Sequence, residues 1–119
     1  MKIHFKKEVG NIGEEIAVEY LKNNNYKIIE KNFYCSQGEI DLTEKDKEEI
    51  VFIEVKTRTN INFGKPSEAV NEIKQKHMYK SAKYFLYKTK NLDKFIRFDV
   101  IEVLIANRKF NINHIKQSI

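Results

Sequence analysis

The fold is decided by the segment 50–57, which reads Ile-Val-Phe-Ile-Glu-Val-Lys-Thr. Nearly all of its residues are β-branched or aromatic, a composition typical of a strand. Side chains alternate between the two faces of a strand, so Val51, Ile53 and Val55 are expected on one face. The opposite face carries Phe52, Glu54 and Lys56. A carboxylate and an ammonium are therefore expected side by side on that face.

The residues before this strand predict one helix and two more strands. Apolar side chains recur at helical spacing over residues 8–24, which predicts an amphipathic helix. Its expected buried stripe consists of Val9, Ile12, Ile16 and Tyr20, widened by Ala17 and Leu21. Strand-like segments follow at 26–33 and 39–43. The charged connection at 44–49 is short enough for a hairpin that joins the second of these strands to 50–57.

The residues after the deciding strand predict a second helix and two closing strands. Beyond a loop at 58–66, Ser67 is expected to cap a helix that runs to about Lys88. The buried side of this helix is expected to hold Val70, Ile73, Tyr84 and Phe85. The closing strands are expected at 95–105 and 109–115. The order α-β-β-β-α-β(-β) predicts an α/β fold in one domain, with a central mixed β-sheet flanked by helices.

Length and composition exclude several classes of protein. With 119 residues the chain has the size of one domain, and no run approaches the roughly 20 apolar residues that cross a bilayer. No membrane partner is therefore expected. Cys35 is the only cysteine, which excludes a disulfide within the chain and a metal site made of cysteines alone. Because no secretory signal follows the N-terminus, we expect a cytoplasmic location.

The balance of charge favours a polyanionic partner. The formal net charge is +5 at pH 7, and neutralising phosphates with lysine or arginine releases counterions from a nucleic acid. The chain is also rich in Lys, Asn and Ile together, a bias that genome composition alone could produce. The charge therefore does not decide the question by itself.

The strand at 39–43 supplies a second carboxylate to the candidate site. Its two faces are expected to hold Ile40 and Leu42 on one side, and Glu39, Asp41 and Thr43 on the other. In an antiparallel hairpin with 50–57, Asp41 can lie beside Glu54 and Lys56. Two carboxylates next to an ammonium suit a hard divalent cation, which lowers the pKa of its bound water. An ordinary half-exposed hairpin with an ion pair gives the same alternation.

The first helix offers a further carboxylate. At about 100° per residue, Glu14 falls at the edge of the apolar stripe, whereas Glu15 falls nearly opposite to it. A carboxylate at the margin of a packed face can reach over the sheet, and one on the far side meets solvent. Glu14 is therefore the expected member of the site.

Several of these segments resemble the YraN-like family of uncharacterised bacterial proteins. The resemblance rests on Gly10-Asn-Ile-Gly-Glu-Glu-Ile-Ala17, Gly38-Glu-Ile-Asp-Leu42 and Val51-Phe-Ile-Glu-Val-Lys-Thr-Arg58. Later matches are Phe63-Gly-Lys-Pro66, Ala69-Val70 followed by Lys74, and Arg97-Phe-Asp-Val100. That family is similar to archaeal Holliday-junction resolvases and belongs to the PD-(D/E)xK nuclease-like superfamily. The resemblance implies the restriction-endonuclease-like αβββαβ core, in agreement with the order above.

The resemblance also implies a role for each residue of the site. By position, Asp41, Glu54 and the Val55 backbone carbonyl would ligate Mg²⁺ or Mn²⁺. Lys56 would orient or activate the attacking water and stabilise the transition state. Glu14 would complete the site directly or through water. Residue 40 is Ile where the name of the superfamily has Pro.

Basic residues near the site are candidates for contact with nucleic acid. These residues are Arg58, Lys65, Lys74, Lys76 and Lys80. Lys76 and Lys80 form a stripe with Lys83 on the second helix, for which a solvated helix face is the simpler account. His77 is expected in the core on the apolar side of that helix. Arg97 and Asp99 alternate in a strand and are expected to form a structural ion pair.

The function expected from these implications is that of a metal-dependent endonuclease that hydrolyses phosphodiester bonds in DNA. Branched or otherwise structured DNA is the expected substrate. The alternative is a non-catalytic nucleic-acid-binding or adaptor module that retains the nuclease fold. Resolvases of similar fold work as dimers, because a four-way junction has two-fold symmetry. A homodimer is therefore compatible with the resemblance.

Overall fold

The computed structural model describes residues 2–59 and 72–117. In chain order its elements are α1 (Lys2–Asn23), β1 (Lys27–Cys35), β2 (Gly38–Asp46), β3 (Glu49–Arg58), α2 (Glu72–Lys88), β4 (Phe95–Ala106) and β5 (Lys109–Ile115). This order confirms the predicted α/β class and agrees with a restriction-endonuclease-like αβββαβ core. Ser67 and Lys65 lie outside the described residues. Neither helix, over the part of the chain that the structure describes, is long and apolar enough to cross a membrane.

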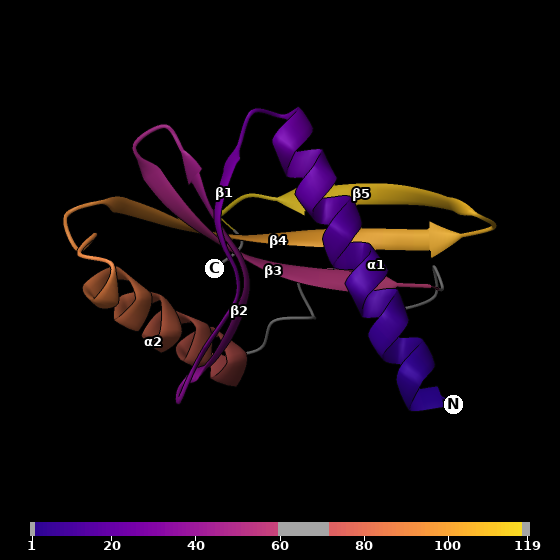
Figure 1. Ribbon diagram of the computed structural model, residues 1–119, viewed down its shortest axis with the longest axis horizontal. Coiled ribbons are helices and arrows are strands. Elements are labelled where there is room, and N and C mark those ends of the chain that lie inside the picture. Colours follow the sequence, from indigo (N-terminus) through magenta and orange to yellow (C-terminus); the bar gives the residue numbers. More distant parts are fainter. Residues whose placement is uncertain (1, 60–71, 118–119) are drawn as a thin grey trace.

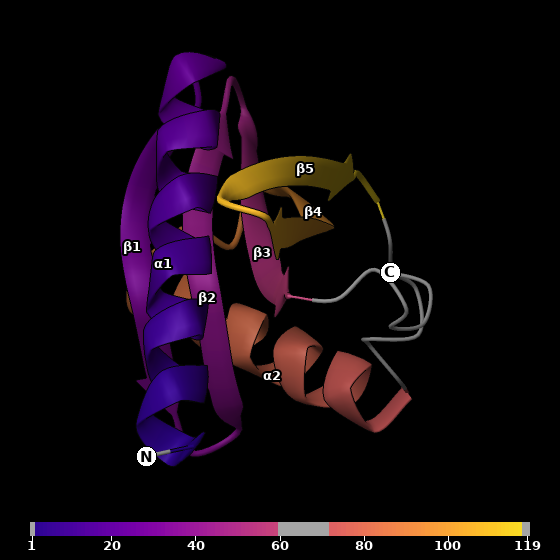
Figure 2. The ribbon, with the colours of Figure 1, turned by 90° about the vertical axis from the view of Figure 1, so that its right-hand side faces the viewer.

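The strands form one mixed sheet in the order β1-β2-β3-β4-β5. β3 and β4 run parallel, and the other neighbouring strands are antiparallel. Helix α1 lies across one face of this sheet, and α2 lies against the other (Figures 1 and 2). Since both faces are covered, the central strand β3 is buried continuously over residues 50–54.

The core is divided by the sheet into two clusters. On the α2 side, Phe52 and Phe98 pack against Met78 and Phe85 of the helix. On the α1 side, Val51, Ile53, Ile101 and Val103 pack against Ala17, Val18 and Leu21. Strand alternation along β3 and β4 therefore divides the apolar residues as the sequence predicts for 50–57.

Element bounds differ from the predictions mainly at the β2–β3 hairpin and at the start of α1. The expected connection at 44–49 is largely strand, because Glu44 pairs with Val51 and Lys45 with Ile50. Only two residues remain for the turn, and Lys47 has a positive φ of 59°. Such a turn matches the twist of paired strands. Helix α1 begins at Lys2 rather than Glu8.

The face of α1 that meets the sheet is rotated from the predicted stripe. Ala17 and Leu21 are fully buried, but Ile12 is 48% exposed. The cause is Gly13, where an added Cβ would lie 1.8 Å from the hydroxyl of Thr57. The helix approaches β3 most closely along its small side chains, and larger ones such as Ile16 lie at the flank.

The buried side of α2 also differs from the prediction. It consists of Met78, Ser81, Ala82, Phe85 and Leu86. Of the predicted residues, Phe85 is buried, Ile73 and Tyr84 are exposed, and Val70 is outside the described residues. Small Ser81 and Ala82 let the middle of the helix approach the sheet, which turns Tyr84 toward solvent.

Replacing Gly13 by alanine tests the close approach of α1. We expect Gly13→Ala to lower the free energy of unfolding by about 1–3 kcal/mol, because its Cβ must displace Thr57. Gly10→Ala is the matched control on the same helix, since its Cβ would meet nothing within 4 Å. That control should stabilise by roughly 0.5–1 kcal/mol through helix propensity. Urea unfolding of both variants measures the difference, and equal effects would contradict the close contact.

Candidate active site

Asp41 lies where backbone pairing between β2 and β3 stops. The register between these strands runs from Asp46 opposite Glu49 to Leu42 opposite Ile53. Beyond that point the Val55 N–H donates a 2.8 Å hydrogen bond to Oδ2 of Asp41. The carboxylate thus satisfies a backbone group that a neighbouring strand would otherwise satisfy.

This change in pairing corrects one prediction for β2. Ile40 and Leu42 were expected on one face of the sheet, but Ile40 packs in the α2-side cluster and Leu42 in the α1-side cluster. β2 therefore twists at Asp41, where the ladder to β3 ends. The expected proximity still holds, because Asp41 and Glu54 line the same small pocket of about 170 Å³.

Glu54 is the charged centre of the site. Its side chain is almost fully buried, and its Oε1 accepts a hydrogen bond from the Lys74 ammonium. The Lys56 ammonium lies 3.4 Å from the same oxygen. Glu54 and Lys56 thus share a face of β3 as predicted, and Lys74 reaches them from the first turn of α2.

Burial and like charge perturb the ionisable groups of this pocket. Burial, followed by the charge of Glu54, raises the pKa of Asp41 to about 8, although the Val55 N–H acts in the opposite direction. Burial and the neighbouring Lys74 ammonium lower the pKa of Lys56. For Lys74, burial disfavours the charge, but the hydrogen bond to Glu54 outweighs it and raises the pKa. The two ammonium groups of the pocket thus both lie at Glu54, while burial and the charge of Glu54 dominate at Asp41.

Glu14 lies at the margin of the same group of carboxylates. It is half-buried, whereas Glu15 is exposed, as the helical spacing predicts. With its amide turned to donate, Asn32 bridges Glu14 at 3.2 Å and Glu39 at 3.1 Å. Burial, and then the charge of Glu39, raises the pKa of Glu14.

The predicted basic residues are distributed unevenly around the pocket. Lys74 lines it directly, and Arg58 pairs with Glu102 at 3.3 Å near the end of β3. Lys76 and Lys80 are exposed on α2 and do not line this pocket.

Two residues near the pocket were missed or misjudged from the sequence. His77 was expected in the core, but its side chain is exposed and lines the pocket with Asp41 and Glu54. It follows Lys74 by about one helical turn, a spacing that could have placed both at one site. Tyr34 is exposed beside Glu39, whose negative charge raises the pKa of the phenol. No pattern in the sequence indicates that position.

The donor set fits a hard divalent cation bound with few protein ligands. No three Asp, Glu, His or Cys side chains lie close enough to form a metal cluster within residues 2–59 and 72–117. Mg²⁺, however, is commonly held by one or two carboxylates, with water and substrate phosphate as its other ligands. Asp41 and Glu54 supply such a pair, and of the two main causes that raise the pKa of Asp41, burial and then the charge of Glu54, a cation would compensate the second.

A second polar cluster lies on the α1 side of the sheet, centred on Asp99. Asp99 accepts hydrogen bonds from Arg97 at 2.9 and 3.0 Å, which confirms the predicted structural pair. His114 lies 2.7 Å from Asp99 through Nε2 and 2.9 Å from the Tyr20 hydroxyl through Nδ1. Burial disfavours the charge of Asp99, but the bonds from His114 and Arg97 lower its pKa. This cluster therefore joins α1, β4 and β5.

The pKa of Asp41 predicts a pH dependence of stability. An ordinary aspartate with a pKa near 3.8 ionises in the unfolded chain, whereas the folded chain keeps this proton up to about pH 8. The stabilising contribution is fully present below pH 4 and is lost as the pH rises to 8. Asp41→Asn still accepts the Val55 N–H and should remove about 1–3 kcal/mol of this decline.

Urea unfolding in chelator at several values between pH 4 and 8 measures the effect. The pH dependence of Asp41→Asn is compared with that of Glu44→Gln. Glu44 lies in the other cluster, where burial and then the charge of Asp99 raise its pKa to about 8. Parallel curves for wild type and Asp41→Asn would contradict the perturbed carboxylate.

Known proteins resemble the chain along most of its length. The family model described as Uncharacterised protein family UPF0102 matches residues 13–103. A UPF0102 protein of Caldicellulosiruptor saccharolyticus is 46% identical over 115 residues, which cover 95% of this chain and 98% of the relative. A UPF0102 protein of Clostridium botulinum is 49% identical over 115 residues, or 94% of each chain. A third, from Caldanaerobacter subterraneus, is 48% identical over 118 residues, or 97% of each chain. The chain therefore belongs to the UPF0102 family, the YraN-like family that its motifs resemble.

Proposed function

We propose that this protein is a metal-dependent endonuclease that hydrolyses phosphodiester bonds in DNA, with branched or otherwise structured DNA as its substrate. The observation that carries the proposal is the meeting of Asp41, Glu54 and Lys56 at the end of β3. Two carboxylates share one pocket there, and the ammonium lies 3.4 Å from Glu54. The resemblance of these residues to the PD-(D/E)xK motif supports the same reading.

In this proposal Asp41 and Glu54 hold Mg²⁺ or Mn²⁺, together with the backbone carbonyl of Val55. When bound, the ion supplies a water of lowered pKa and a positive charge next to the scissile phosphate. Burial, followed by the charge of Glu54, raises the pKa of Asp41, and a cation held there would offset the repulsion between the two carboxylates. Glu14 lies near enough to influence this carboxylate electrostatically and would act through water.

Lys56 is proposed to act on the attacking water and on the charge of the transition state. Its lowered pKa brings the amine closer to accepting a proton from water at neutral pH. In its charged form it stabilises the negative charge that develops on phosphate oxygens. Lys74 hydrogen-bonds to Glu54, so it holds this carboxylate in place until substrate and metal arrive.

Cleavage assays test the proposal. We expect Mg²⁺- or Mn²⁺-dependent cutting in a screen of linear, single-stranded, flap and four-way-junction DNA. Asp41→Asn and Lys56→Met should each lower the rate by about 100-fold or more, because the first removes a proposed metal ligand and the second removes the amine that acts on the water and the phosphate. Gel analysis of labelled strands measures the rate.

Matched controls lie at the opposite end of the same hairpin. Glu48 and Lys45 are exposed near the β2–β3 turn, so Glu48→Gln and Lys45→Met make the same changes of charge away from the pocket. Both should cleave at the wild-type rate. Cleavage that survives in Asp41→Asn and Lys56→Met would overturn the site. Binding without cleavage of any substrate would favour the non-catalytic module.

A further inference from the structure

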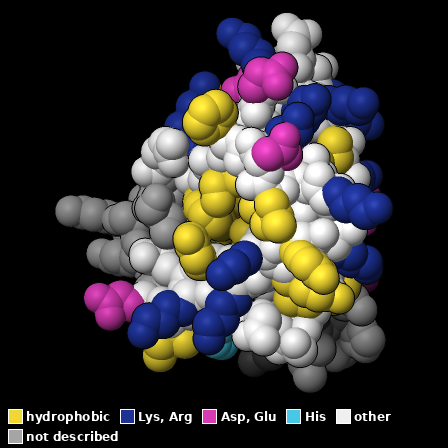
Figure 3. All heavy atoms as spheres, turned by 90° about the vertical axis from the view of Figure 1, so that its left-hand side faces the viewer, with side chains coloured by type: hydrophobic (Ala, Val, Ile, Leu, Met, Phe, Trp, Pro, Cys, Tyr) yellow, Lys and Arg dark blue, Asp and Glu magenta, His cyan; other side chains and the backbone are white. Residues whose placement is uncertain are grey.

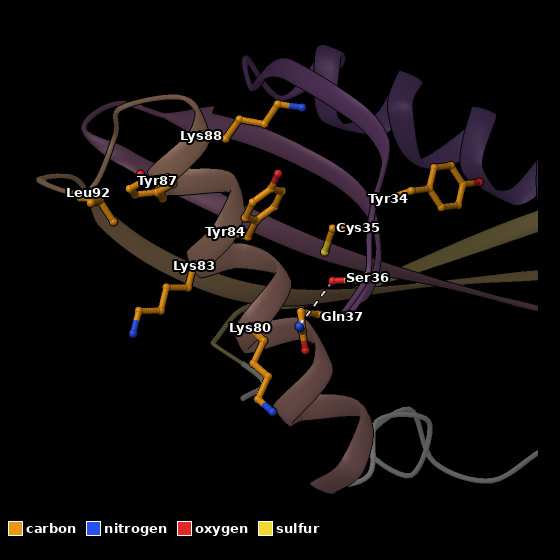
Figure 4. Close-up of a pocket in the computed structure, with 10 residues that line it drawn as sticks. All are labelled: Tyr34, Cys35, Ser36, Gln37, Lys80, Lys83, Tyr84, Tyr87, Lys88 and Leu92. Atoms are coloured by element: carbon orange, nitrogen blue, oxygen red, sulfur yellow. Dashed lines mark hydrogen bonds between the residues drawn. The ribbon is translucent and has the colours of Figure 1, made fainter.

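A groove separate from the proposed cleavage site lies between α2 and the turn that joins β1 to β2. Its volume is about 790 Å³, within the range of roughly 300–1,000 Å³ that is typical of ligand sites. The turn residues 35–37 form one wall and the second half of α2 forms the other (Figure 4). The space-filling view places hydrophobic and basic side chains next to one another on this side of the molecule (Figure 3).

Aromatic rings form the apolar part of the groove. Tyr84 is 46% exposed and Tyr87 is 70% exposed, and both come from the same side of α2. The ring of Tyr84 is anchored against Phe33, with centroids 6.1 Å apart, and projects from α2 on the side that lines the groove (Figure 4). Tyr87 lies beside Leu92 at the far end of the groove (Figure 4). Exposed and partly anchored rings can stack on planar ligands.

The charged part of the groove is entirely basic. Lys80, Lys83 and Lys88 line it, and no aspartate or glutamate does so. Lys80 and Lys83 make no ion pair with any described carboxylate. The Lys88 ammonium lies over the Phe33 ring, 5.9 Å from its centre. A ligand of this groove should therefore carry several negative charges as well as flat apolar groups.

A single strand of nucleic acid has both properties. Its phosphates match the lysines, and its unpaired bases can stack on tyrosine rings. The bases of a duplex are stacked on one another and cannot lie against a ring without leaving the helix. The composition of the groove therefore favours single-stranded over double-stranded nucleic acid.

The groove and the proposed cleavage pocket are neighbours along α2. Gly38 lines that pocket, and it directly follows the groove residues 35–37. An added Cβ on Gly38 would lie 3.6 Å from both His77 and Ser81 of α2, so turn and helix are in close contact between the two hollows. From Lys74 to Tyr87 the helix rises about 20 Å, a length that spans several nucleotides.

We propose that this groove binds the unpaired strand of the substrate, with bases stacked on Tyr84 and Tyr87 and phosphates held by Lys80 and Lys83. The inference rests on the proposed function, because it names the substrate class for the same site. It predicts that the preferred DNA carries a single-stranded segment next to the position that enters the carboxylate pocket. Fully paired linear DNA has no unpaired base that could stack on the two tyrosines.

Binding of oligothymidylate in EDTA tests the groove without requiring cleavage. Fluorescence anisotropy with the full chain should give tighter binding of the single strand than of a duplex of equal length. Tyr87→Ala and Tyr84→Ala should each weaken binding of the single strand roughly tenfold, and Tyr87→Phe should restore it, since phenylalanine keeps the ring. Phe110→Ala is the matched control, because Phe110 is an exposed ring on β5 outside the groove.

The lysines are tested by the dependence of binding on salt. Lys80→Gln with Lys83→Gln should lower the slope of log affinity against log salt by about 0.7 per lysine. Lys27→Gln with Lys45→Gln removes the same charge from the paired strands β1 and β2, where both lysines are exposed. This control should change the slope less.

Three results of the binding assay, and a fourth from competition, would overturn the proposal that the groove binds a single strand. These are equal binding of single strand and duplex, unchanged affinity in both tyrosine variants, and equal weakening by these variants on an abasic strand. Effective competition by polyglutamate of equal charge would also contradict the proposal, because negative charge without bases would then be enough for binding to the groove. The assay is independent of catalysis. If the wild type cleaves DNA but the tyrosine variants bind the single strand as tightly as the wild type, only the groove proposal is wrong. If the tyrosine variants bind more weakly but no DNA is cleaved, only the nuclease proposal is wrong.

Discussion

The covering of β3 on both faces is the constraint on which the rest of the structure depends. Because α1 and α2 lie on opposite faces of the sheet, the strand is buried from Ile50 to Glu54 and opens only from Val55 onward. A charged side chain in the middle of such a strand would lose its hydration without gaining partners. Glu54, the last residue of the buried run, has such partners in the Lys56 and Lys74 ammonium groups, and Lys56 lies where the burial ends. The location of Glu54 and Lys56 follows from this limit of burial.

Two carboxylates of this sheet, Asp99 and Asp41, have pKa values that are shifted in opposite directions. Asp99 is fully buried but receives hydrogen bonds from Arg97 and His114, and its pKa is lowered. At Asp41, burial and then the charge of Glu54 raise the pKa to about 8, and the hydrogen bond from the Val55 N–H does not offset them. The first carboxylate joins secondary-structure elements. The second stores an electrostatic imbalance that a bound cation would relieve, which is typical of functional sites.

Glu44 follows neither pattern. Among the described residues no group hydrogen-bonds either of its carboxylate oxygens, although the side chain is completely buried. Its pKa is raised to about 8, chiefly by burial and then by Asp99. At neutral pH the folded chain therefore holds this group with its proton.

Strand periodicity predicted the parts of the site that depend on a single element. Glu54 and Lys56 share a face because they are two residues apart, and Glu14 rather than Glu15 is half-buried near Asn32 of β1 because of its helical angle. The order of elements and the fold class could be read in the same way. These properties depend on local geometry, which the sequence carries directly.

Properties that depend on how closely elements approach could not be predicted. The stripe of α1 is rotated because Gly13 lets the helix descend onto Thr57, a distance that periodicity does not contain. Ile40 and Leu42 lie on opposite sides because pairing with β3 stops at Asp41. His77 is exposed for a similar reason, since the contact face of α2 is set by its small residues. In each case tertiary packing outweighed the local pattern.

The parallel pairing of β3 with β4 has a consequence for how the chain folds. Glu49 lies opposite Phe95, so the two central strands can meet only after a long stretch of chain, with α2 inside it, has closed into a loop. The β2–β3 and β4–β5 hairpins need only short loops and can form earlier, since closure entropy increases with loop length. The desolvated environment of Glu54 arises only when α2 docks on the sheet. A folding intermediate that contains just the hairpins would hold the same carboxylates in water, with their ordinary chemistry.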